Sequence, residues 1–172
     1  MSRFLAAAAL VALSACQSLP GSGPSAVASL QPTTKGKASG TVTFTQVAEN
    51  RVRVTGTVTG LAPGREHGFH IHEAGDCSSG DGMSAKGHFN PFAKPHGNPM
   101  AGEHHAGDLP ALKADATGTA TVDAQIEGIS VAPGPASIVG RGLIVHADPD
   151  DYKTQPTGNA GARIACAVIQ RT

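Results

Sequence analysis

The sequence predicts a single all-β domain of about eight strands with two long functional loops. Several segments alternate apolar and polar residues, which is typical of strands with one buried face. Glycine (22 residues) and proline (12 residues) are frequent, as expected where many short strands are joined by turns. No stretch of roughly ten residues shows the periodicity of an amphipathic helix. With 172 residues, the chain is about long enough for one domain.

The first predicted strands follow from strict alternation. Residues 38–47 and 51–58 place small or polar residues between valines and a phenylalanine. Residues 48–50 leave only a tight connection between them, so we expect a hairpin. The sequence Leu-Ala-Pro-Gly at 61–64 is a turn, and residues 66–72 follow it as a third strand.

The second half of the chain is divided by the same patterns. Residues 118–126 alternate, whereas residues 138–146 form a nearly continuous apolar run, which indicates a strand buried on most sides. The remaining predicted segments are a weak strand at 109–114, a final strand at 162–169, and long loops at 73–104 and 147–161.

The N-terminal segment is predicted to lie outside the fold. Arg3 precedes an apolar run at residues 4–13, which is too short to span a membrane and suits a signal peptide at residues 1–15. The run ends in Leu-Ser-Ala-Cys, which resembles the lipobox of bacterial lipoproteins and implies a lipid on Cys16. The alternative is an ordinary export signal. Residues 16–37 are rich in Ser, Pro, Gly and Thr, so we expect a lipidated, flexible tether before a domain at 38–172.

Two further cysteines are available for a disulfide. Export would place Cys77 and Cys166 in an oxidising compartment, where a disulfide persists. A bridge would close a loop of roughly 90 residues, worth about 4.6 kcal/mol at most on the chain-entropy model. Two buried free thiols are the alternative.

The formal net charge is zero and the pI is about 7.1. A nucleic-acid partner would need a basic patch, so this class is excluded.

Histidines are concentrated between residues 70 and 108, a stretch that is mostly loop and contains six of the chain's 8 histidines. A long loop in a compact domain needs a reason, and metal binding is a common one. His70 and His72 lie two apart on a predicted strand, so both side chains project from one face. Because four ligands suffice for a tetrahedral metal, the candidates predict two sites or one shared site. They are His70, His72, His88, His96, His105, Asp108 and His146.

At these residues the chain resembles a known family. GFHIHEAGDC, GHFNP, KPHG, HAGD, GRGLIVHADPDD and GNAGARIACAVI resemble the copper/zinc superoxide dismutases in order and spacing, over residues 38–170. The short loop at 148–160 and the arrangement of residues 77–86 resemble the bacterial branch. The resemblance implies a Greek-key, immunoglobulin-like β-sandwich or flattened barrel of antiparallel strands.

The resemblance also implies one copper ion and one zinc ion per chain. His88 would bridge them, with one ring nitrogen on each metal. The implied copper ligands are His70, His72, His88 and His146, and the implied zinc ligands are His88, His96, His105 and Asp108.

The resemblance assigns further roles around the metals. Asp150 matches a carboxylate that hydrogen-bonds one copper histidine and one zinc histidine, which orients both ligands. Arg163 matches an arginine at the mouth of the copper site, where it would attract the anionic substrate. Lys153 is a weaker candidate for the same steering role. Cys77 and Cys166 match the disulfide of the family.

The implied enzyme converts superoxide to dioxygen and hydrogen peroxide by alternate reduction and oxidation of copper, with His88 taking up a proton and returning it. A metal carrier is a second hypothesis, but it has no need of an anion site. A zinc hydrolase is a third, and would require a carboxylate base beside an open zinc. We expect an exported, periplasmic antioxidant enzyme whose membrane contact is the lipid on Cys16. Whether the chain is a monomer or a homodimer stays open.

Overall fold

The computed structural model describes residues 23–172. The expected signal peptide at residues 1–15 and the lipid site at Cys16 lie outside the described residues. Within residues 23–172, no helix is long and apolar enough to cross a membrane.

The described chain is built almost entirely of strands, which confirms the predicted fold class. Apart from the strands, it contains a single short 3₁₀ helix at Met83–Ala85. The strands are β1 (Ser25–Pro32), β2 (Ser39–Ala48), β3 (Arg51–Thr59), β4 (Glu66–His67), β5 (Phe69–His72), β6 (Leu112–Lys113), β7 (Ala120–Glu127), β8 (Gly142–His146), β9 (Arg163–Val168) and β10 (Gln170–Arg171).

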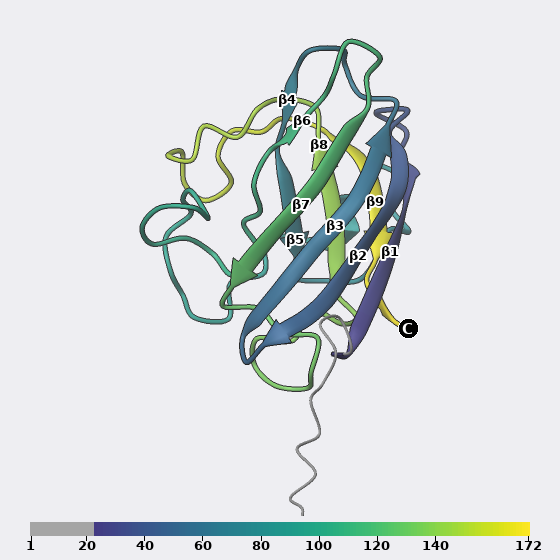
Figure 1. Ribbon diagram of the computed structural model, residues 1–172. Helices are drawn as coiled ribbons and strands as arrows, with labels where there is room; N and C mark the ends of the chain where they lie inside the picture. The colour runs from purple at the N-terminus through teal and green to yellow at the C-terminus, as the bar shows by residue number, and fades with distance from the viewer. Residues whose placement is uncertain (1–22) are drawn as a thin grey trace, which may run out of the picture.

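The strands form a curled, antiparallel sheet with two faces, in the order β5-β8-β9-β1-β2-β3-β7. Strands β1, β2, β3 and β7 make one layer, and β5, β8 and β9 lie behind them (Figure 1). Strand β1 joins the layers, because Ser25–Leu30 pairs with β2 whereas Gln31 and Pro32 pair with β9. Neighbours such as β3 and β7 are not consecutive, so the chain crosses between the layers as a flattened barrel requires.

The core lies between the layers and takes alternate residues from β1, β2 and β3, whereas β5 and β8 are buried at every position. Val42 and Phe44 of β2 and Val52 and Val54 of β3 are almost completely buried. The predicted hairpin is confirmed, since β2 and β3 pair along their lengths. Its turn places Asn50 at φ 54°, a left-handed conformation that asparagine tolerates well. Each fully buried large apolar side chain contributes roughly 1.5–3 kcal/mol, so this alternation stabilises the scaffold for the loops.

The flexible tether predicted at residues 16–37 is wrong for residues 25–32, which form β1. Ala26, Ala28 and Leu30 alternate toward the core and are fully buried. The small size of the two alanines hid the period of two, because Ser and Ala do not distinguish a buried strand from a linker by composition. The folded domain therefore begins before residue 38, the predicted boundary.

Two predicted strands are interrupted in the structure. The segment 66–72 divides at Gly68, since β4 pairs with β6 whereas β5 pairs with β8. The backbone of Gly68 bonds to segments on both sides of the change: its N–H donates to Asp148 O at 2.9 Å, and its carbonyl accepts from His146 N at 2.8 Å. The apolar run 138–146 forms a strand only over Gly142–His146, although Ile138 is also fully buried.

Candidate metal centre

Four histidines converge beside the β5–β8 pair. His70 and His72 lie on β5, His146 ends β8, and His88 comes from the long loop. All four are buried, and one nitrogen from each lies within 4.8 Å of the others. His70 and His72 are two apart on one strand, so they face the same side, as the sequence predicts.

The loop reaches this position because it returns along the free edge of β5. Ile71 N donates to Gly107 O at 2.8 Å, and Phe89 N donates to Ile71 O at 2.9 Å. These bonds align His88 with His72 and Asp108 with His70 in short antiparallel bridges. The approach is close enough to require glycine, since a Cβ on Gly107 would lie 2.2 Å from Ile71 O. Backbone pairing therefore places two loop residues against the strand histidines.

We call His70, His72, His88 and His146 the copper-type cluster, after the ligands that the resemblance implied. This cluster leaves one nitrogen of each ring without a hydrogen-bond partner. These buried atoms are His70 Nδ1, His72 Nε2, His88 Nε2 and His146 Nε2. Buried polar atoms are normally paired, so four unpaired ring nitrogens in one place fit a metal site. The opposite nitrogens explain which atom is free: His72 Nδ1 donates to Lys86 O at 2.8 Å, and His146 Nδ1 donates to Gly161 O at 3.3 Å. Each bond leaves Nε2 as the basic nitrogen.

A second cluster consists of His88, His96, His105 and Asp108, which is the donor set of a closed zinc site, and we call it the zinc-type cluster. His88 Nδ1 and His96 Nδ1 lie 2.8 and 3.0 Å from Asp108 Oδ1. His105 Nδ1 lies 3.5 Å from the same oxygen and 3.4 Å from His88 Nδ1. Ligands of a tetrahedral zinc are roughly 3.3 Å apart, so the four atoms fit a zinc ion. His88 therefore belongs to both clusters, through Nδ1 in one and Nε2 in the other.

Asp150 connects the two clusters. Its Oδ2 accepts from His70 Nε2 at 2.7 Å, and its Oδ1 accepts from His96 Nε2 at 2.9 Å. Burial alone would raise the pKa of Asp150, but the bonds from His70 and His96 hold it well below its usual range. The carboxylate is thus ionised, and it orients one histidine of each cluster.

The histidines of the metal-free protein differ in their protonation. Burial lowers the pKa of His88 to about 4 and that of His146 to about 3, so both rings are neutral at pH 7. Burial also lowers the pKa of His72. Burial opposes protonation of His96, but its bonds to Asp108 and Asp150 raise its pKa to about 9. Metal must displace a proton from His96 to bind there.

Arg163 begins β9 beside the copper-type cluster. Its Nη1 donates to Gly82 O at 2.7 Å, and its Nη2 donates to Lys86 O at 2.6 Å. The carbonyl of Lys86 is shared, because it also accepts from His72 Nδ1. One peptide group thus fixes the half-buried guanidinium relative to a copper-type ligand.

The predicted disulfide is present and anchors the same region. Cys77 and Cys166 are bonded, with Cα atoms 5.9 Å apart and a sequence separation of 89. Cys166 lies on β9 three positions after Arg163, so the bridge attaches the loop that carries Gly82 and Lys86 to the strand that carries Arg163.

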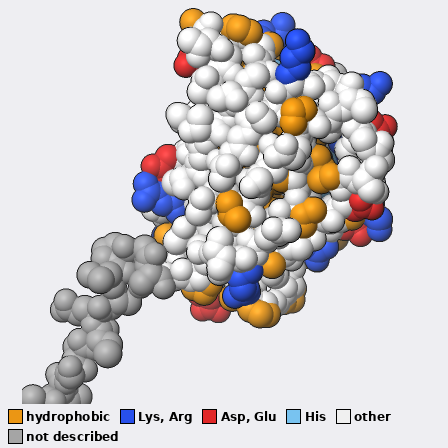
Figure 2. Space-filling model, turned by 90° about the vertical axis from the view of Figure 1, so that its right-hand side faces the viewer, with side chains coloured by type: hydrophobic (Ala, Val, Ile, Leu, Met, Phe, Trp, Pro, Cys, Tyr) orange, Lys and Arg blue, Asp and Glu red, His pale blue; other side chains and the backbone are white. Residues whose placement is uncertain are grey.

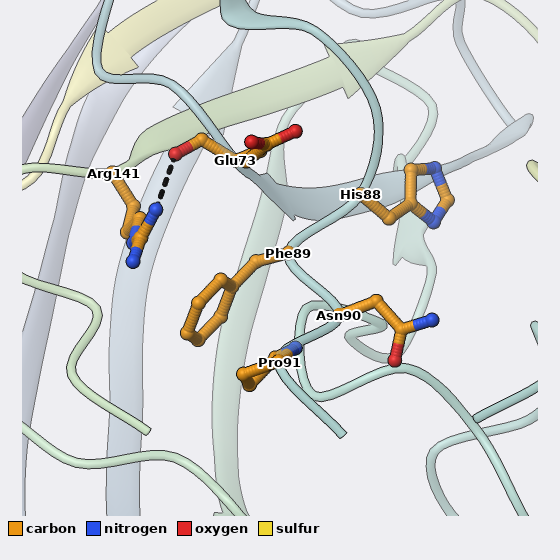
Figure 3. A pocket seen from close by; sticks show the side chains of 6 residues that line it. All are labelled: Glu73, His88, Phe89, Asn90, Pro91 and Arg141. Carbon is orange, nitrogen blue, oxygen red and sulfur yellow. Dashed lines mark hydrogen bonds between the residues drawn. The ribbon is translucent and has the colours of Figure 1, made fainter. Parts of the chain in front are cut away.

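A pocket lies beside His88, on the side away from its ring (Figure 3). Arg141 stacks its guanidinium over the Phe89 ring, 4.4 Å from the centroid, and Nη1 donates to Glu73 O at 2.7 Å. Glu73 N in turn donates to Gly87 O at 2.9 Å. These contacts support the backbone on both sides of His88 rather than forming part of the ligand cluster.

The structure adds two residues that the sequence did not indicate. Lys86 contributes its carbonyl to both His72 and Arg163. Gln155 binds both backbone groups of His96 through its side-chain amide. Both interactions involve backbone atoms of one partner, and no residue type or spacing signals such contacts.

An all-β sandwich with two buried clusters that share one histidine defines a class of dinuclear metalloprotein. A family model described as copper/zinc superoxide dismutase (SODC) matches residues 38–169. Superoxide dismutase [Cu-Zn] 2 of Brassica juncea is 48% identical over 139 residues, which is 76% of this chain and 88% of that protein. The crystal structure of the clock protein EA4 is similar to this chain, with a TM-score of 0.77 and 40% sequence identity. The match covers 93% of this chain and 100% of the EA4 chain.

The chain belongs to the copper/zinc superoxide dismutase family. It is an enzyme that uses one copper ion and one zinc ion, and it converts superoxide to dioxygen and hydrogen peroxide.

Proposed function

We propose that superoxide is disproportionated beside the four-histidine cluster of His70, His72, His88 and His146, with the neighbouring cluster holding zinc for structure. The observation that carries this assignment is His88, whose two ring nitrogens belong to different clusters. When bound, copper supplies the alternating one-electron steps and zinc, which has no redox chemistry, supplies fixed positive charge. The remaining work falls to side chains of the chain itself.

Arg163 is the residue we assign to anion binding. Its guanidinium is always charged and is fixed by two carbonyl oxygens rather than by a carboxylate. The formal net charge of the chain is zero, so attraction of a small anion depends on where this cation lies. Lys153 on the second loop is a weaker candidate for the same role.

His88 is the residue we assign to proton transfer. In the metal-free protein its Nε2 is unpaired and faces the copper-type cluster, whereas Nδ1 faces Asp108. The ring can therefore hold a proton at Nε2 and release it while Nδ1 stays in the zinc-type cluster. This gives the peroxide product one of its protons from a fixed position.

Superoxide consumption by the metal-loaded protein tests this assignment. Replacing Arg163 with isoleucine should lower the rate by about tenfold or more and weaken its dependence on ionic strength, because attraction of the anion is lost. Replacing His146 with alanine should remove copper and abolish turnover, while zinc is retained. Copper binding without turnover in the unaltered chain would instead favour a carrier, although the buried ligand donors do not favour exchange.

We also propose that the protein is a lipoprotein of a bacterial envelope, attached through Cys16 in the periplasm. The support is the apolar run at residues 4–13 followed by Leu-Ser-Ala-Cys. Expression in a bacterium with labelled palmitate should give a labelled, membrane-associated protein, and Cys16→Ser should release it unlabelled. A labelled Cys16→Ser protein would contradict the proposal.

A second copy of the chain is the protein partner that we propose. The face formed by β1 and β9 is mostly uncharged and carries scattered apolar side chains, while charged ones lie mainly near its edge (Figure 2). A pocket on this face is lined by residues of both strands and by the disulfide. Val168→Glu should convert a dimer to a monomer in sedimentation experiments, and a monomeric wild type would refute the assignment.

A further inference from the structure

Gln155 makes two hydrogen bonds to the backbone of a zinc-type ligand. Its Oε1 accepts from His96 N at 2.8 Å, and its Nε2 donates to His96 O at 2.9 Å. The amide thus pairs with His96 as a neighbouring strand would pair with it. Among the described residues, no other hydrogen bond joins residues 151–160 to residues 90–105.

His96 needs such support more than the other ligands do. His70, His72 and His146 lie on paired strands, and His88 and Asp108 form bridges with β5. His105 is held three residues from Asp108, to which its N–H donates at 2.9 Å. The segments that flank His96, residues 91–95 and 98–103, are largely exposed and have no strand partner. Gly97 N donates to Asp108 Oδ2 at 3.1 Å, and the remaining hydrogen bonds to the backbone groups of His96 come from Gln155 of the second loop.

The position of the His96 backbone decides where both ring nitrogens lie. Nδ1 must meet Asp108 Oδ1, which is 3.0 Å away, while Nε2 meets Asp150 Oδ1 at 2.9 Å. A small rotation of the peptide would move the ring away from one carboxylate or the other. A side chain that holds both the N–H and the C=O of His96 restricts that rotation.

We propose that Gln155 is a positioning residue that preorganises His96 for zinc and slows zinc loss. This rests on the assignment of the His88–Asp108 cluster to zinc. The bonds from Gln155 are formed without reference to a metal, so the metal-free loop keeps the ligand in place. Partners that orient a ligand typically change metal affinity by roughly 10–100-fold when removed.

The test compares zinc release from the full-length protein loaded with zinc alone, measured with a coloured chelator. Gln155→Ala removes both bonds, and we expect zinc to leave about tenfold faster. Gln155→Glu keeps an acceptor for His96 N but places a carboxylate against His96 O, and should also release zinc faster. Gln125→Ala is the matched control, because Gln125 is an exposed residue of β7 far from the metal centre. It should release zinc at the wild-type rate.

Two further measurements separate positioning from general stability. In the metal-free protein, Gln155→Ala should speed amide hydrogen exchange at His96 without changing exchange in β2 and β3. In the cobalt-substituted protein it should alter the visible spectrum, which reports the ligand geometry. Unchanged zinc release and unchanged exchange at His96 would overturn the proposal. Absence of zinc binding in the wild type would instead refute the zinc assignment.

Discussion

Lys86 adopts a backbone conformation that is rare for any residue other than glycine. Its φ is 63° and its ψ is −147°. Residues in this region carry strain of roughly 1–3 kcal/mol and persist only where surrounding contacts hold them. Here the contacts are the bonds from His72 and Arg163 to the Lys86 carbonyl. The peptide is strained because two side chains of the metal centre require its oxygen in one place.

Replacing Lys86 with glycine should therefore stabilise the protein. The carbonyl stays and the strain is removed, while glycine loses roughly 0.5–1 kcal/mol through its greater freedom when unfolded. We expect a net gain of about 1 kcal/mol in the free energy of unfolding, measured in urea. Lys86→Ala is the control and should give no gain, because alanine keeps the strain and the exposed pair of Lys86 with Glu73 at 4.0 Å contributes little. A less stable glycine variant would contradict this account.

Gly158 shows how little room surrounds the bridging carboxylate. A Cβ at this position would lie 1.9 Å from Asp150 Oδ1 and 2.6 Å from His96 Nε2. Gly158→Ala should displace Asp150 from both clusters and weaken zinc and copper binding by roughly 10–100-fold, measured as metal content after dialysis. Gly128→Ala is the control, because Gly128 has a left-handed φ of +80°, like Gly158 at +65°, but a Cβ at Gly128 would have no neighbour within 4 Å. It should lose some stability and keep its metals.

The two clusters of candidate ligands were predictable from the sequence because their chemistry lies in their side chains. His70 and His72 show their common face through spacing alone, and family motifs located the loop histidines. Gln155 and Lys86 were not predictable, because each acts on or through a backbone group whose position depends on the whole fold. Side-chain type therefore identifies donors, whereas the supports of those donors require coordinates.

Among the elements, the strands with large buried residues were predicted within a few positions, and β1 was missed. Alternation of Val and Phe in β2 leaves a clear apolar face, whereas β1 buries Ala26, Ala28 and Leu30 among serines. Composition suggested a linker because alanine and serine are common in both settings. The pairing of β1 with β2 and β9 shows that it belongs to the domain.

A chain that begins at residue 38 should fail to fold cooperatively. It would lack β1, exposing the edges of β2 and β9 and removing three fully buried side chains from the core. A chain that begins at residue 23 keeps the strand and should unfold at the temperature of the longer protein. Circular dichroism during heating distinguishes the two. A cooperative transition in the shorter chain, at the same temperature, would show that β1 is dispensable.

For the whole molecule, the rigid sandwich and the two loops divide the metal centre between them. Three copper-type ligands lie on β5 and β8, while His96 and His105 of the zinc-type cluster come from the loop. Both long loops lie on the same side of the sandwich, where they meet through Asp150 and Gln155 (Figure 1). Loss of metal should therefore affect the stability of the whole chain through the buried histidines.

The stability of the metal-free protein should have a maximum near pH 6.5. His88 and His146 have folded-state pKa values of about 4 and about 3, below the unfolded value of roughly 6.5. As the pH falls from 6.5 toward 4, the unfolded state takes up protons that the folded state rejects, so stability is lost. His96 has a raised folded-state pKa of about 9, so its contribution to stability is complete below pH 6.5 and is lost as the pH rises toward 9.

Urea unfolding from pH 4 to 9 measures the loss of stability on both sides of pH 6.5. With copper and zinc bound, the loss on the acid side should extend below pH 4, because the metals prevent the folded state from taking up the protons that the unfolded state takes up. A metal-free protein that gains stability between pH 6.5 and 4 would show that these histidines are not buried as neutral rings.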